Sequence, residues 1–147
     1  MIVHLLDTGA GNVLSVINAL RLLEVEVVTI KDKIDLELAT HVIFPGVGAF
    51  GPSMRKLHAT GLVEPLKHYI KNGKPFMGIC VGMQALVLTS EESPEETGLG
   101  LVPAHCARFT ASDKSVPHMG WNGISPCQDT AFANHDGPDS SISMYLH

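Results

Sequence analysis

The chain has 147 residues, of which 45% are hydrophobic and 17% are charged. These values are typical of a globular domain with a sizeable core, and they exclude a disordered chain. A formal net charge of −5 argues against the basic surface that binds nucleic acids or anionic lipids. No apolar run is as long as a membrane span. We expect no signal or transit peptide, because the charged n-region and the cleavage pattern are missing.

The cysteines and histidines indicate a protein of a reducing compartment and predict no metal centre in it. The three cysteines, Cys80, Cys106 and Cys127, form no Cys-x-x-Cys pair and predict neither a disulfide framework nor a zinc site. The eight histidines show no HExxH spacing. We therefore expect a cytoplasmic protein with no cofactor.

Short apolar segments alternate with helical ones along the first 90 residues. Strands are predicted at residues 2–6, 25–30, 41–46 and 75–80, where β-branched and aromatic side chains gather. Helices are predicted at 13–23, 62–71 and 81–88. Apolar strands that alternate with helices indicate an α/β fold, an open and mostly parallel sheet with helices on both faces.

For the helices at 13–23 and 62–71, the sequence also predicts an end and the buried face. In the first, polar residues recur only every third position, so we expect a helix buried on most of its circumference, with Asn12 as the N-cap. In the second, Leu66 and Tyr69 share one face, and Asn72-Gly73 ends the helix.

After Ser90 the alternation of apolar strands and helices gives way to loops, turns and short strands. A polar loop over residues 91–100 is followed by short strands within 98–109, a turn-rich stretch at 116–124 and a further loop at 128–141. The last residues, 141–147, predict the opening of another strand. We expect the sheet's last strands to be missing from residues 1–147, which we interpret as one partial domain.

The sequence Gly78-Ile79-Cys80-Val81-Gly82 lies where a predicted strand meets a predicted helix. Glycines on both sides of a nucleophile allow the sharp turn that presents its side chain outward. Unpaired N–H groups at the helix start stabilise a negatively charged sulfur, and the Val81 N–H can face a developing oxyanion. The alternative is a structural cysteine in a buried strand.

Two other glycine-rich stretches follow strands. "FPGVGAFG", residues 44–51, can expose backbone N–H groups, and Val47 or a neighbour can supply a second oxyanion donor; a tight strand–helix connection is equally compatible. "DTGAGN", residues 7–12, lacks the third glycine of the dinucleotide-binding fingerprint, because Leu14 occupies that position.

The segments "FPGVGAFG", "GKPFMGICVGMQAL", "VPHMGWN" and "MYLH" together resemble the class I glutamine amidotransferases. Within that family they are similar to the glutaminase of imidazole glycerol phosphate synthase. The resemblance implies a flavodoxin-like α/β fold. It also implies hydrolysis of glutamine to glutamate and ammonia, with ammonia passing to a (β/α)8-barrel cyclase, fused or separate. The cyclase would make imidazole glycerol phosphate and AICAR for histidine biosynthesis.

The resemblance also assigns roles by position. It implies that Cys80 is the nucleophile and that the backbone N–H groups of Val47 and Val81 form the oxyanion hole. Substrate-binding positions implied in the same way are Gly46, Gly48, Gln84 and His147.

The general base of the family lies in a His-Pro-Glu sequence, and none of the eight histidines here precedes a proline. General acid–base help is worth roughly 10²–10⁴-fold in rate, so we expect the 147-residue chain to be inactive alone. Three alternatives stay open. They are a non-catalytic fragment that docks on the cyclase, a glutaminase of another class I amidotransferase, and an unrelated hydrolase with a cysteine elbow.

Overall fold

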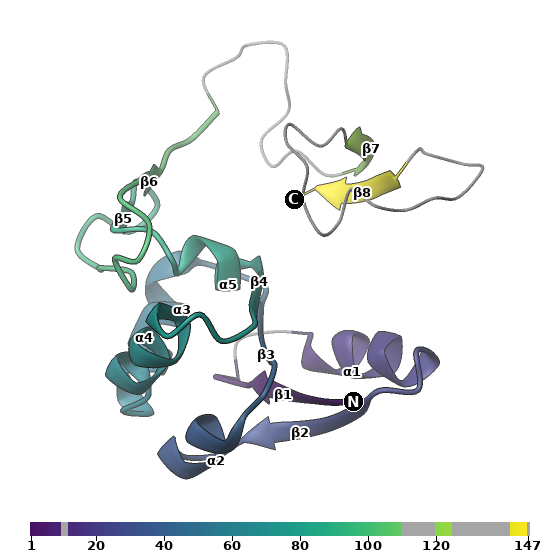
Figure 1. Cartoon of the computed structure of the whole chain (residues 1–147). Coiled ribbons are helices and arrows are strands. Elements are labelled where there is room, and N and C mark those ends of the chain that lie inside the picture. The colour runs from purple at the N-terminus through teal and green to yellow at the C-terminus, as the bar shows by residue number, and fades with distance from the viewer. Residues whose placement is uncertain (10–11, 110–119, 125–141, 147) are drawn as a thin grey trace. The chain divides into compact units, whose positions relative to one another are not determined.

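The computed structural model describes residues 1–9, 12–109, 120–124 and 142–146 (Figure 1). It contains two compact units, Met1–Arg108 and Phe109–His147, which we describe separately. The interpretation of residues 1–147 as one partial domain stays a prediction. Among the described helices, none is both long and apolar enough to cross a membrane.

The first unit is built on a four-stranded sheet with the order β2-β1-β3-β4. All three strand pairings are parallel, as predicted. The strands are β1 (Ile2–Leu6), β2 (Glu26–Ile30), β3 (Val42–Gly46) and β4 (Phe76–Cys80), each within one residue of its predicted start. In a parallel sheet all carboxyl ends meet at one edge, so Leu6, Gly46 and Cys80 end at the same rim.

Five helices belong to this unit: α1 (Val13–Leu22), α2 (Lys33–Leu38), α3 (Phe50–Ala59), α4 (Val63–Lys71) and α5 (Val81–Gln84). The predicted N-cap is confirmed, since the Asn12 side chain accepts a hydrogen bond from the Ser15 N–H. The predicted end of α4 is also confirmed, with Asn72 as C-cap and Gly73 at φ 71°. The helices α2 and α3 were not predicted from the sequence.

The core lies on the face of the sheet that α2, α3 and α4 cover (Figure 1). Phe44 from β3 packs there with Leu36, Met54 and Leu66 from the three helices, and all four side chains are at most 1% exposed. This single cluster fixes β3 and α3, the two elements that flank the loop described below.

Helix α1 lies on the other side of the sheet (Figure 1). The prediction that it is buried on most of its circumference is wrong, because none of its residues is buried and Leu14 and Leu22 are 62% and 86% exposed. The apolar surface of α1 is wider than its contact with the sheet, so only part of it is covered within Met1–Arg108.

The segment after β4 differs from its prediction. The expected helix over 81–88 ends at Gln84, and the chain continues into the short parallel pair β5 (Thr89–Ser90) and β6 (His105–Cys106). The reason is a long-range contact: the Leu99 N–H donates to the Ala85 carbonyl at 2.7 Å, and neighbouring residues of the two segments pair in the same way. Those carbonyls are then no longer used to extend α5.

In the second unit, β7 (Gly120–Ile124) pairs antiparallel with β8 (Ile142–Leu146). The predicted strand at the last residues is thus confirmed over 142–146. The predicted turn-rich stretch is wrong at 120–124, where the backbone is extended and paired.

Candidate active site

Cys80 lies at the last position of β4 and is the N-cap of α5. Its backbone has φ 54° and ψ −114°, and Glu24 is the only other non-glycine residue with positive φ in the described ranges. Such a conformation costs a residue with a Cβ about 1–3 kcal/mol and persists only where the surroundings impose it. The side chain is half-buried and its sulfur is a free thiol. The strand–elbow–helix geometry predicted from the sequence is therefore present.

The glycines on both sides of Cys80 are required by close backbone packing. A Cβ at Gly78 would lie 2.5 Å from the Gly82 carbonyl carbon and 2.6 Å from the Met83 nitrogen. A Cβ at Gly82 would lie 2.8 Å from the Phe44 carbonyl carbon and would overlap the carbonyl oxygen of that residue. Thus β4 folds back directly onto α5, and α5 presses onto β3, with no space for side chains between them.

The predicted oxyanion loop lies beside the thiol residue. Gly46 is the register partner of Cys80 in the β3–β4 ladder, and a Cβ at Gly46 would lie 3.1 Å from the Val81 Cβ. Val47 and Gly48 follow, both exposed, and Gly48 has φ +117°, which favours glycine. The structure therefore brings residues 46–48 and Cys80 together at one rim of the sheet.

Of the other predicted site residues, Val81 and Gln84 lie in α5 and His147 lies outside the described residues. Val81 is the first residue of α5, a position whose N–H has no acceptor within its own helix, and its side chain is 1% exposed. Gln84 is the last residue of α5, one turn beyond Cys80, and is half-buried.

The polar loop 91–96 is a part of the site region that sequence analysis did not identify. The Glu92 carboxylate accepts the Phe50 N–H at 3.1 Å, and the Ser93 hydroxyl accepts the Gly51 N–H at 3.1 Å. Both contacts hold the start of α3, directly after the 46–49 loop. An acidic stretch rich in Ser and Pro is compatible with capping, but the sequence does not show which helix it caps.

Cys106 differs from Cys80 in its surroundings and is the natural internal reference for labelling. Partial burial, with a further contribution from the Glu92 carboxylate, raises the pKa of the Cys106 thiol. Because the thiolate is the reactive form, we expect iodoacetamide to modify Cys106 more slowly at pH 7.5 than it modifies an unstructured cysteine peptide. Glu92→Gln should increase the rate, as peptide mass spectrometry can show. An unchanged rate in that variant would contradict the electrostatic contribution.

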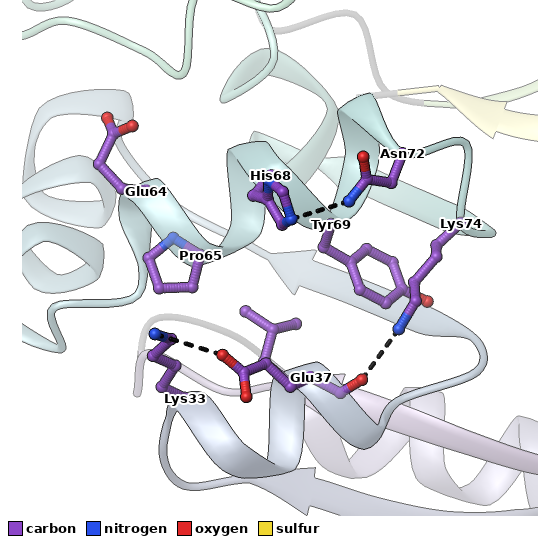
Figure 2. A pocket seen from close by; sticks show the side chains of 9 residues that line it. Lys33, Glu37, Glu64, Pro65, His68, Tyr69, Asn72 and Lys74 are labelled. Carbon is purple, nitrogen blue, oxygen red and sulfur yellow. Dashed lines mark hydrogen bonds and ion pairs between the residues drawn. The ribbon is translucent and has the colours of Figure 1, made fainter.

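A cavity of about 530 Å³ lies between α2 and α4 and not at Cys80 (Figure 2). Its charged side chains already have partners: Lys33 pairs with Glu37, and Lys74 donates to the Glu37 and Ala39 carbonyls. The candidate site is the rim near Cys80, where a residue with a free thiol has positive φ. The residues that line the cavity include no cysteine. No cluster of three metal-ligating side chains occurs in the ranges that the structure describes.

Comparison with known proteins decides the family. Residues 4–146 match the family described as Glutamine amidotransferase class-I. The chain belongs to the class I glutamine amidotransferases. A solved structure titled "Crystal structure of glutamine amidotransferase" aligns with a TM-score of 0.73 at 19% identity, covering 99% of this chain and 70% of that one. At that identity the likeness supports the fold, and the predicted fold class is confirmed.

Curated relatives of this amidotransferase chain carry one name in two forms. "Imidazole glycerol phosphate synthase hisHF" of Schizosaccharomyces pombe is 48% identical over 131 residues, 89% of this chain and 24% of the relative. "Imidazole glycerol phosphate synthase subunit HisH" of Chlorobaculum tepidum is 37% identical over 145 residues, 99% of this chain and 72% of the relative. The chain thus spans about a quarter of the hisHF relative and about three quarters of the HisH relative.

Proposed function

We propose that this chain carries the glutaminase of imidazole glycerol phosphate synthase, with Cys80 as the nucleophile. The observation that carries the proposal is the backbone of Cys80, a non-glycine residue at φ 54° between two glycines that have no room for a Cβ. A conformation that costs free energy at a residue with a reactive side chain supports a catalytic role.

The reaction follows from the thiol and the amide. The Cys80 Sγ attacks the side-chain carbonyl carbon of glutamine, and the carbonyl oxygen becomes an oxyanion near the Val47 and Val81 N–H groups. The C–N bond then breaks, ammonia leaves with the thiol proton, and a γ-glutamyl thioester remains. Water cleaves the thioester, which releases glutamate and restores the thiol. Gly46, Gly48, Gln84 and His147 are proposed to seat the substrate.

The proposed partner is a (β/α)8-barrel cyclase that consumes the ammonia. The names of the relatives support it, since both the long hisHF form and the HisH subunit are called imidazole glycerol phosphate synthase. Histidine biosynthesis in the cytoplasm is the corresponding pathway and place.

A chloroketone analogue of glutamine tests the proposal. The tests below use a full-length protein, meaning one that contains these 147 residues and also supplies the His-Pro-Glu sequence of the family. In that protein we expect the analogue to modify Cys80 and not Cys106, and we expect millimolar glutamine to slow the modification at least tenfold. Peptide mass spectrometry identifies the labelled cysteine. Modification of Cys80 that glutamine does not slow would support a hydrolase of another specificity and would contradict the proposal.

An assay of glutamate release distinguishes the enzyme from a docking module. We expect the full-length protein to release glutamate from glutamine, faster when the cyclase is present. A protein that binds the cyclase tightly but releases no glutamate in either condition would instead be a non-catalytic docking module.

A further inference from the structure

The segment from Ser90 to Glu96 holds the start of α3 from a distance of about forty residues along the chain. The N-cap residue of α3 is Ala49, which has no side-chain acceptor for the first N–H groups of the helix. Glu92 and Ser93 accept two of these N–H groups, those of Phe50 and Gly51. One turn further, the Arg55 guanidinium pairs with Glu96 at 2.6 Å.

The contact between Ser93 and Gly51 is the most buried of these, since the contact of Glu92 is part-buried and that of Arg55 is exposed. Ser93 is 7% exposed and Gly51 is buried. A Cβ at Gly51 would lie 2.6 Å from the Ser93 Oγ, so there is no space for a side chain at Gly51 beside Ser93. Removing the hydroxyl would leave the buried Gly51 N–H without this acceptor, which typically costs about 1–3 kcal/mol.

This contact is close in sequence to the loop beside Cys80. At one end of that loop, Gly46 is fixed as the register partner of Cys80. At the other end, the Ala49 carbonyl accepts the Ser53 hydroxyl at 2.9 Å, and the next two N–H groups are held by Glu92 and Ser93. Only Val47 and Gly48 lie between the fixed ends, so the place of the Val47 N–H depends on where α3 begins.

We infer that Ser93 is a positioning residue for the oxyanion loop: through the Gly51 N–H it fixes the start of α3, and thereby the Val47 N–H beside Cys80. The inference rests on the proposed function, because the loop has an oxyanion to bind only if Cys80 attacks an amide. Ser93 itself touches no reacting atom in this arrangement. Ser93 affects the rate of amide cleavage only through the backbone geometry of residues 47–51.

The test compares Ser93→Ala with Thr60→Ala in the full-length protein. Thr60 is the matched control, because its hydroxyl also makes hydrogen bonds at an end of α3. It donates to the Leu57 carbonyl at 2.6 Å and accepts from the Leu62 N–H at 3.2 Å. These contacts lie at the opposite end of the same helix. Both variants should lower the melting temperature by a similar amount.

The kinetic readouts should separate the two variants. We expect Ser93→Ala to lower kcat for glutamine roughly tenfold or more with KM within about twofold, since a displaced oxyanion donor acts in the transition state. Labelling of Cys80 by the chloroketone analogue should slow in parallel. Alkylation by iodoacetamide, which needs no oxyanion donor, should change less than about twofold. Thr60→Ala should leave all three rates unchanged.

Wild-type kcat in a folded Ser93→Ala protein, or an equal kcat loss in Thr60→Ala, would overturn the inference. If Ser93→Ala does not fold, Arg55→Gln tests the same attachment of residues 92–96 to α3, because it breaks the ion pair with Glu96. We expect it to lower kcat about threefold with little change in KM. An unchanged kcat would again contradict the inference. Absence of Cys80 labelling in the unsubstituted protein is a different result, and it would overturn the proposed function together with this inference.

Discussion

Cys80→Ala is expected to abolish synthesis that depends on glutamine and to leave synthesis that uses free ammonia unchanged. The alanine keeps the volume of the elbow nearly constant but removes the sulfur that forms the thioester in the proposed mechanism, so no step of amide cleavage should start. Loss of a catalytic nucleophile typically costs on the order of 10⁶-fold in kcat. In the proposed mechanism ammonia enters after the step of Cys80, so its use should need no thiol.

The measurement is the rate of imidazole glycerol phosphate formation by the full-length protein with the proposed cyclase, with either glutamine or an ammonium salt as nitrogen donor. Cys106→Ala is the control, since Cys106 is half-buried, lies on the two-residue strand β6 and has a raised thiol pKa. That variant should keep both activities. A Cys80→Ala protein that still uses glutamine would show that the nucleophile is elsewhere.

The sequence alone was sufficient for the parts of the site that depend on local spacing. Gly78, Cys80 and Gly82 show the elbow because each glycine is needed within two residues of the thiol. The four strands are readable for a similar reason, since each is a short and mainly apolar run rich in β-branched or aromatic side chains. Gly46 could be placed beside Cys80 only through the family resemblance and, finally, through the strand register.

Helix α3 could not be predicted in the same way. It begins at Phe50-Gly51-Pro52, a sequence typical of a loop, and the acceptors for its first N–H groups come from Glu92 and Ser93. No pattern within residues 46–60 contains that information. The premature end of α5 has the same origin, because Leu99 takes the Ala85 carbonyl from a different part of the chain.

Helix α2 is a different case, because its signal was local. Asp32 accepts hydrogen bonds from the Ile34 and Asp35 N–H groups at 2.8 and 3.0 Å, the pattern of an N-cap. The helix has only six residues and buries one leucine, Leu36, so its apolar periodicity is too short to read. A capping signal without a hydrophobic repeat was not sufficient to predict it.

Gly82→Ala is expected to destroy the elbow although the substitution adds only a methyl group. That methyl would lie 2.8 Å from the Phe44 carbonyl carbon, 3.3 Å from the Phe44 ring carbon Cγ and still closer to the carbonyl oxygen. Phe44 cannot move aside, because it is 1% exposed in the centre of the core and belongs to β3. Either α5 must leave β3, which moves Cys80 and Val81 together, or the core must open.

The size of the effect follows from overpacking against rigid backbone. Inserting a methyl into a packed core typically costs about 1–3 kcal/mol and more where backbone must shift, so we expect a loss of roughly 3 kcal/mol or more. For a domain of this size the melting temperature should fall by roughly 6–12 °C. Cys80 should also lose its preference for the chloroketone analogue over iodoacetamide, because the Val81 N–H moves with α5.

Gly61→Ala is the matched control. It is the same substitution, but its strain comes from the backbone conformation and not from a steric overlap. Gly61 has φ +71° and nothing within 4 Å of a Cβ, so alanine there costs only the left-handed backbone, about 1 kcal/mol. It should lower the melting temperature slightly and leave the labelling of Cys80 unchanged. If Gly82→Ala melts like Gly61→Ala and still labels at the wild-type rate, the backbone of α5 does not press on β3. The elbow that presents Cys80 would then have to be held by other contacts.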